Sequence, residues 1–453
     1  MLERLLINIR LWQLTSARIW IIPISLIFFA ITSWLLLMFL PIKYALIGSI
    51  GMILTTLSIF IAPYTGIILF LCTFCLPEEL EGFPFSAAIL GMTILAWILK
   101  ELNPKEMIKS PQNRLIFVLW IIMIISSLFA YKREYCLDTL FEFTNLFLFY
   151  LVTINLINSE KKFHHVVWTI IIIFALLSLK NAIFCAVHGL SRQGGAGGDD
   201  NHFAVGLNMA LPFSLYILFI TRNGVKQITA MLSFILIIVG IILTISRGGF
   251  IGLCVVLFLF LLKARKPALL VIYLFLFVFI FLVGTVLIPK EYTERMETIS
   301  GYQKDDSAMA RIHYWYAGGR MMMERPICGV GIGNFKEIVH LYNPDLNLVA
   351  HNTFIQIASE CGIPGLIVFV SLIMVSIIKT IRLRERLKTI PDGHRLLLFT
   401  HMIEVSFTAY VICGSFLSEV DFEFLYLLIA MSVCLGNIAQ QADRESNSVV
   451  SDQ

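Results

Sequence analysis

Four side chains have the types needed for chemistry on an anionic substrate. His351 ends a long polar stretch and stands directly before a new apolar run, 353–378. Imidazole can accept a proton near neutral pH, so His351 is a candidate general base. Arg192, Arg247 and Arg311 are fixed cations, and a guanidinium can form two hydrogen bonds to one phosphate. One base and three fixed cations at a membrane face predict chemistry on an anionic, lipid-attached substrate.

Each arginine also has a simpler interpretation. Arg192 opens the glycine-rich sequence RQGGAGGDDNH at 192–202, where backbone could approach a ligand closely or merely form a flexible loop. The acidic end of this sequence could instead hold a divalent cation, but its ligands are adjacent rather than spaced, so we predict no metal site. Arg247 joins two apolar runs and either faces a partner or fixes helix depth. Arg311 is either a ligand or an ordinary solvated cation.

Further polar residues could support this site. A helix starting near Asn352 would carry Asn352, Gln356 and Glu360 on one face, which would then be polar inside an apolar run. Lys180 lies in another apolar run and either serves the anionic site or extends to the interface. Asn201 and His313 complete the predicted supporting set.

The polar stretch 289–351 contains one predicted helix and one predicted turn. Residues 308–324 favour a helix that ends before Pro326, because a residue preceding proline avoids the helical region. The glycine-rich sequence GVGIGNF at 329–335 is similar to a phosphate-binding loop, but no strand precedes it and no Lys-Ser/Thr follows. We therefore expect a tight turn that docks this stretch on the membrane.

Composition defines the class of protein. Hydrophobic residues make up 58% of 453 residues and charged residues 14%, and the mean hydropathy is +0.86. These values predict an all-α polytopic membrane protein, since a transmembrane helix needs about 20 mostly apolar residues. The apolar runs predict twelve to fourteen transmembrane helices, at 19–40, 43–61, 64–79, 84–99, 115–130, 139–157, 164–188, 203–221, 227–245, 249–262, 267–288, 353–378, 396–416 and 422–439.

Basic residues predict the orientation. They concentrate in alternate loops, such as 100–114, 263–266 and 379–388, which we expect to be cytoplasmic. The other loops then face outward, and this places His351 and the three arginines on one side. The predicted organisation is a cytoplasmic tail at 1–18, N-terminal transmembrane helices at 19–188, a core at 189–439 that includes the large outer loop 289–351, and a disordered tail at 440–453.

Several short motifs occur together in a familiar order. They are SRGG at 246–249, Arg311 with Trp315, RPICGVGIGNF at 325–335, and HNTF at 351–354 followed by ECGIPG at 360–365. With these motifs, residues 190–380 resemble the O-antigen ligase and O-antigen polymerase superfamily of bacterial inner-membrane glycosyltransferases. The sequence DDNH at 199–202 is also similar to a subgroup of putative O-glycosylation ligases. Ligases of this family are usually described with twelve spans, fewer than the maximum of fourteen predicted above.

The resemblance implies a specific reaction on a GT-C-like helical scaffold. It is an inverting transfer that needs no metal or cofactor, from a glycan on undecaprenyl pyrophosphate to an acceptor hydroxyl at the periplasmic face of the inner membrane. The acceptor is a lipid A-core sugar, a growing glycan or a protein. His351 would act as the general base, and Arg192, Arg247 and Arg311 would hold the pyrophosphate.

Two alternatives to a ligase stay open. A polymerase that extends glycans would use the same site, so sequence does not separate the two. A transporter or lipid flippase would show repeats and charges near the membrane midplane. Here the polar residues gather at one face and no repeat is visible, which favours an enzyme; nucleic acid is not an expected partner.

Overall fold

The structure is a computed structural model that describes residues 42–75, 85–100, 110–188, 200–263, 306–388, 394–418 and 420–451. Within these ranges every regular element is a helix, and eight helices are long and apolar enough to cross a membrane. The chain is therefore an all-α polytopic membrane protein, as its composition predicted.

Each predicted span that lies within the described residues contains a helix. These helices are α2 (Ile42–Ile61), α3 (Thr65–Cys72), α4 (Phe85–Lys100), α5 (Pro111–Leu128), α6 (Cys136–Leu156), α7 (Glu160–His188), α8 (Asp200–Ile220), α9 (Gly224–Leu243), α10 (Arg247–Lys263), α15 (Thr353–Leu387), α16 (His394–Gly414) and α17 (Glu423–Ser451). Helix α3 is shorter than its predicted span and continues as the 3-10 turn Thr73–Cys75. The predicted spans 19–40 and 267–288, and the predicted tail 1–18, lie outside the described residues.

The chain divides into two compact units, of which the first comprises Met1–Lys109 and Leu148–Thr169. Its contacts are mostly apolar. Phe70 and Phe149 stack with ring centroids 4.3 Å apart, and the ring of Tyr64 stacks on His165 at 6.0 Å. This unit contains none of the predicted site residues.

The second unit comprises Ser110–Phe147 and Ile170–Gln453, and α8 lies in its interior. Helices α9, α10 and α16 all pack against α8, which is buried along nearly its whole length. Polar side chains in this interior bond to the backbone of neighbouring helices. Asn208 donates to the carbonyl of Gly249 at 3.0 Å, and Ser406 donates to the carbonyl of Met209 at 2.7 Å. Such bonds satisfy polar groups that have no access to water.

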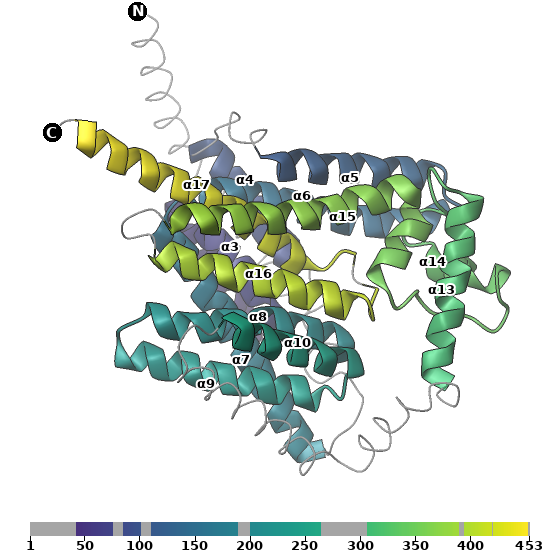
Figure 1. Ribbon diagram of the computed structural model, residues 1–453, viewed down its shortest axis with the longest axis horizontal. Helices are drawn as coiled ribbons and strands as arrows, with labels where there is room; N and C mark the ends of the chain where they lie inside the picture. The colour runs from purple at the N-terminus through teal and green to yellow at the C-terminus, as the bar shows by residue number, and fades with distance from the viewer. Residues whose placement is uncertain are drawn as a thin grey trace, which may run out of the picture. The chain divides into compact units, whose positions relative to one another are not determined.

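Helix α13 (Asp306–Glu324) runs across the ends of α15 and α16 (Figure 1). It confirms the helix predicted at 308–324. Tyr314, Ala317 and Met321 lie on one face of α13 and pack in a buried cluster with the turn after it. This cluster also includes Phe335 of the short helix α14 (Phe335–Ile338) and Ala350, the residue before His351. Residues 306–350 therefore form a packed layer rather than an open loop.

Helix α15 is interrupted at Gly362, which has φ 69° and ψ −171°. The break frees backbone groups that would otherwise bond along the helix, and Pro364 has no N–H to offer. Residues 326–331 supply the missing partners. Val330 N donates to Ser359 O at 2.9 Å, Gly331 N donates to Glu360 O at 3.1 Å, and Ile363 N donates to Pro326 O at 2.8 Å. The glycine-rich turn thus docks on α15, and its docking on the membrane stays a prediction.

Helix α17 continues to Ser451, so residues 440–451 are helical. The polar composition had predicted a disordered tail there. Extending an existing helix needs no new nucleus, and the residues directly after 439, at 440–445, are mostly good helix formers. The apolar first part of α17 therefore forms the helix, and the polar residues after it extend that helix.

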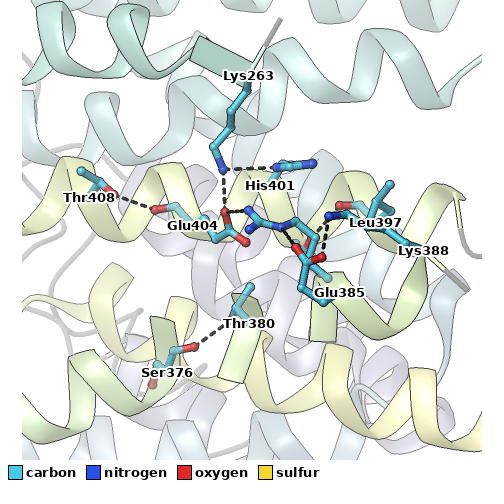
Figure 2. A network of polar contacts seen from close by, with 11 residues as sticks. Lys263, Ser376, Thr380, Glu385, Lys388, Leu397, His401, Glu404 and Thr408 are labelled. Carbon is cyan, nitrogen blue, oxygen red and sulfur yellow. Dashed lines mark hydrogen bonds and ion pairs between the residues drawn. The ribbon is translucent and has the colours of Figure 1, made fainter. Parts of the chain in front are cut away.

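A network of charged residues joins α10, α15 and α16 at the end of the unit opposite His351 (Figure 2). The Glu404 carboxylate, only 8% exposed, lies 2.5 Å from Lys263 Nζ and 2.5 Å from Arg384 Nη1. His401 Nδ1 lies 3.2 Å from Lys263 Nζ. Glu404 is a charge in an apolar span that we did not single out from sequence. Its two cations come from the ends of other helices, so it ties three helices together.

Glu404→Gln should lower the free energy of unfolding by about 3 kcal/mol, because Lys263 and Arg384 would lose their shared buried carboxylate. Unfolding by sodium dodecyl sulfate in mixed micelles, followed by tryptophan fluorescence, measures this change. Glu385→Gln is the matched control, since Glu385 is 53% exposed where it pairs with Lys388 and Arg384, and this variant should stay near wild type. Equal stability of the two variants would contradict a structural role for the network.

Candidate functional site

His351 is held in an uncommon backbone conformation just before α15. Its φ is 50°, in the left-handed region that residues other than glycine seldom adopt. Such strain persists only where surrounding contacts impose it, and it is concentrated at functional sites. The imidazole meets the ring of Tyr314 edge to face, with centroids 6.0 Å apart and planes at 80°. The predicted base therefore lies between α15 and the packed layer formed by residues 306–350.

Asn352 and Thr353 fix the start of α15 to the segment that ends α16. The Asn352 side chain caps α15, because its Oδ1 accepts from Phe354 N at 3.0 Å and from Ile355 N at 3.1 Å. Its Nδ2 donates to Ser415 O at 3.0 Å, and Thr353 Oγ1 donates to Leu417 O at 2.8 Å. Asn352 therefore supports His351 through the helix cap.

The same segment contacts the turn that carries Arg247. Cys413 Sγ lies 3.8 Å from Gly248 O, and a Cβ added to Gly248 would contact the Phe416 side chain at 3.2 Å. Arg247 is the first residue of α10, and His351 lies two residues before α15. Because both adjoin residues 413–417, Arg247 and His351 lie at the same end of the second unit.

Ser246 and Asn201 set the position of Arg247. Ser246 Oγ donates to Asn201 Oδ1 at 2.7 Å and accepts from Gly249 N at 3.1 Å, which caps α10. Ile245, immediately before Ser246, has a φ of 50°. The α9–α10 turn thus combines a strained residue, a helix cap and a bond to α8. Asn201 therefore helps to hold the turn that carries Arg247.

Arg311 lies on α13, three residues before Tyr314. Its side chain is partly buried, whereas His313 is exposed and points from another part of the helix surface. Trp315, four residues after Arg311, has a buried Nε1 without a hydrogen-bond partner among the described residues. Arg311 therefore lies about one helical turn from Tyr314, which contacts His351, whereas His313 is exposed.

Gln356 and Glu360 are buried as predicted, but their polar atoms serve the fold. Gln356 Oε1 accepts from Ala350 N at 3.1 Å and from Ser418 Oγ at 3.2 Å, while its Nε2 donates to Glu360 Oε1. The same Glu360 oxygen accepts from Phe335 N at 3.2 Å. The polar face of α15 thus holds the backbone before His351 and the glycine-rich turn.

Asn334 fixes that turn to the α5–α6 connection. Its Oδ1 accepts from Lys132 N at 2.8 Å, and its Nδ2 donates to Lys132 O at 3.1 Å. Sequence reasoning quoted Asn334 and Ser246 within motifs without giving them a role, and it did not identify Tyr314. The signals available were Asn334 at the end of the glycine-rich run and Ser246 before Arg247, both typical of caps and turns. Nothing in the pattern around Tyr314 indicated its contact with His351.

The remaining predicted residues are Lys180 and Arg192. Lys180 is exposed on α7, near the end of that helix. Arg192 lies outside the described residues, so its predicted role remains a prediction. In the described part of the chain, no group of three or more His, Cys, Asp or Glu side chains could hold a metal ion.

The grouped residues can support proton abstraction next to bound anionic charge. His351 is the candidate base, and Arg247 and Arg311 are the candidate anion-binding cations at the same end of a membrane-spanning bundle. These features define a multi-pass membrane protein with a polar layer that covers one end of its helices.

The family comparison specifies this class further. Residues 232–370 match the family model Wzy_C, described as O-antigen ligase. This O-antigen ligase domain match supports the O-antigen ligase superfamily and confirms the resemblance of the motifs. The matched segment includes Arg247, Arg311 and His351 but not Lys180 or Arg192. A comparison with curated proteins found no match.

Gly329→Ala should destabilise the docked turn. Gly329 has φ 66°, and an added Cβ would overlap the backbone of Glu360. The left-handed conformation alone costs an alanine about 1–2 kcal/mol. Gly319→Ala is the matched control, because Gly319 is helical and has open space around it. The rate of limited proteolysis between α13 and α15 should rise for the first variant only. A similar rate in both variants would contradict this account of the turn.

Proposed function

We propose that the protein transfers a glycan from undecaprenyl pyrophosphate to an acceptor hydroxyl, with inversion, at the periplasmic face of a bacterial inner membrane. The family match supports glycan transfer of the ligase or polymerase type. The observation that carries the proposal is the grouping of His351, Arg247 and Arg311 at one end of the bundle. A lipid-attached donor keeps its pyrophosphate at the membrane surface, which is where such a group can reach it.

In this mechanism His351 removes the proton from the acceptor hydroxyl. The acceptor oxygen then attacks the anomeric carbon from the side opposite the pyrophosphate, the glycosyl bond to phosphate breaks, and the configuration inverts. Arg247, Arg311 and Arg192 stabilise the negative charge that grows on the departing undecaprenyl pyrophosphate. Pyrophosphate is already a good leaving group, so positioning and charge stabilisation supply most of the rate enhancement.

The test is a transfer assay with purified protein, an undecaprenyl-pyrophosphate-linked oligosaccharide and mixed acceptors, with products resolved by gel and by mass. One glycan on a lipid or protein acceptor would identify a ligase. A ladder of repeats on the carrier lipid would identify a polymerase. Movement of intact donor across the membrane without release of undecaprenyl pyrophosphate would identify a flippase instead.

His351→Ala should lower the transfer rate about 100- to 10,000-fold, the usual contribution of a general base. The donor concentration for half-maximal rate should stay unchanged, because the arginines still bind the pyrophosphate. His340→Ala is the control, since His340 is exposed in the same outer layer. Near wild-type transfer by His351→Ala would refute the assignment of the base.

Lysine substitutions test the pyrophosphate site. The transfer rate should fall about 100-fold in each of Arg247→Lys, Arg311→Lys and Arg192→Lys. Lysine keeps the positive charge but cannot form the bidentate hydrogen bonds that a guanidinium forms with phosphate. Arg320→Lys is the control, since Arg320 is half exposed and pairs with Glu324. Full activity in all three variants would reject arginine binding of the pyrophosphate.

A further inference from the structure

Tyr314 is a buried side chain that contacts the segment carrying His351 in two ways. It is only 4% exposed, and its ring packs edge to face against the imidazole of His351. Its hydroxyl oxygen accepts hydrogen bonds from Asn347 N at 3.2 Å and from Leu348 N at 3.1 Å. One residue therefore contacts both the proposed base and the backbone that leads to it.

The backbone around His351 is held on both sides. Upstream, Tyr314 holds residues 347 and 348, and Gln356 accepts from Ala350 N at 3.1 Å. Downstream, the Asn352 cap starts α15. These contacts confine His351 to a left-handed conformation that it would not adopt by itself. Loss of the Tyr314 hydroxyl would leave two partly buried N–H groups without their acceptor, which favours a shift of the segment.

Tyr314 also connects the base to the proposed anion site. It lies on α13 three residues after Arg311, so both side chains project from neighbouring positions on one helix. A shift of α13 would thus move the cation and the base together. This coupling matters for transfer because the acceptor oxygen must meet the base and the anomeric carbon at the same time.

We propose that Tyr314 is a positioning residue that orients His351 for proton abstraction, an inference that rests on the proposed function. The hydroxyl fixes the path of residues 347–348, and the ring edge limits rotation of the imidazole. Tyr314 neither takes the proton nor binds the pyrophosphate. Its effect therefore passes through His351.

The experiment uses native-host membranes in which each full-length variant replaces the wild-type chain. The probe is an undecaprenyl-pyrophosphate-linked oligosaccharide, and the readout is release of undecaprenyl pyrophosphate against donor concentration. Tyr314→Phe keeps the ring and loses the hydroxyl, and its maximal rate should fall about 10- to 100-fold. The half-saturating donor concentration should not change. Tyr316→Phe is the control, since Tyr316 is 73% exposed two residues along the same helix.

The decisive comparison adds Tyr314→Phe to His351→Ala. If Tyr314 acts through His351, the double variant should have the same residual rate as His351→Ala alone. A further fall in the double variant, or a full rate in Tyr314→Phe, would overturn the positioning role while leaving the proposed function intact. A full rate in His351→Ala would overturn both proposals, so the two failures are distinguishable.

Discussion

The break in α15 at Gly362 is the constraint on which the outer layer depends. A span has no water to bond to the backbone groups that a break releases, so protein must bond to them. The Glu360 carbonyl loses its helical donor because Pro364 has no N–H, and it accepts instead from Gly331 N and from Ser126 Oγ. Residues 326–331 are therefore bound to a transmembrane helix by backbone hydrogen bonds. Through them, α13 is held at a fixed position over the end of the bundle.

Two buried carboxylates in the second unit are stabilised in different ways. Glu360 receives neutral donors, from Gln356 and from the backbone of Phe335. Glu404 receives two cations, Lys263 and Arg384. The neutral network lies beside the strained His351 and fixes backbone there. The ionic network lies at the opposite end and joins helices. Cations near the proposed base thus remain separate from those that hold the bundle together.

The helices could be predicted from sequence because the signals that mark them lie within short stretches of the chain. Continuous apolar runs located the spans, and Pro326 marked the end of α13. The candidate site was proposed from residue type, since a histidine and arginines beside apolar runs are unusual, and it stays a prediction. The break at Gly362 was missed, although Gly362 and Pro364 are visible, because its stability depends on a segment about thirty residues away. Tyr314 and Glu404 were missed for the same reason: each acts through residues that are distant in sequence.

Helix α10 is held by contacts at two points along its length. Ser246, which caps it, is bonded to Asn201 of α8, and Lys263 pairs with Glu404 of α16. The helix therefore cannot slide along its axis relative to α8 and α16 without breaking one of these contacts. Arg247, its first residue, accordingly keeps a constant depth relative to the helices around it.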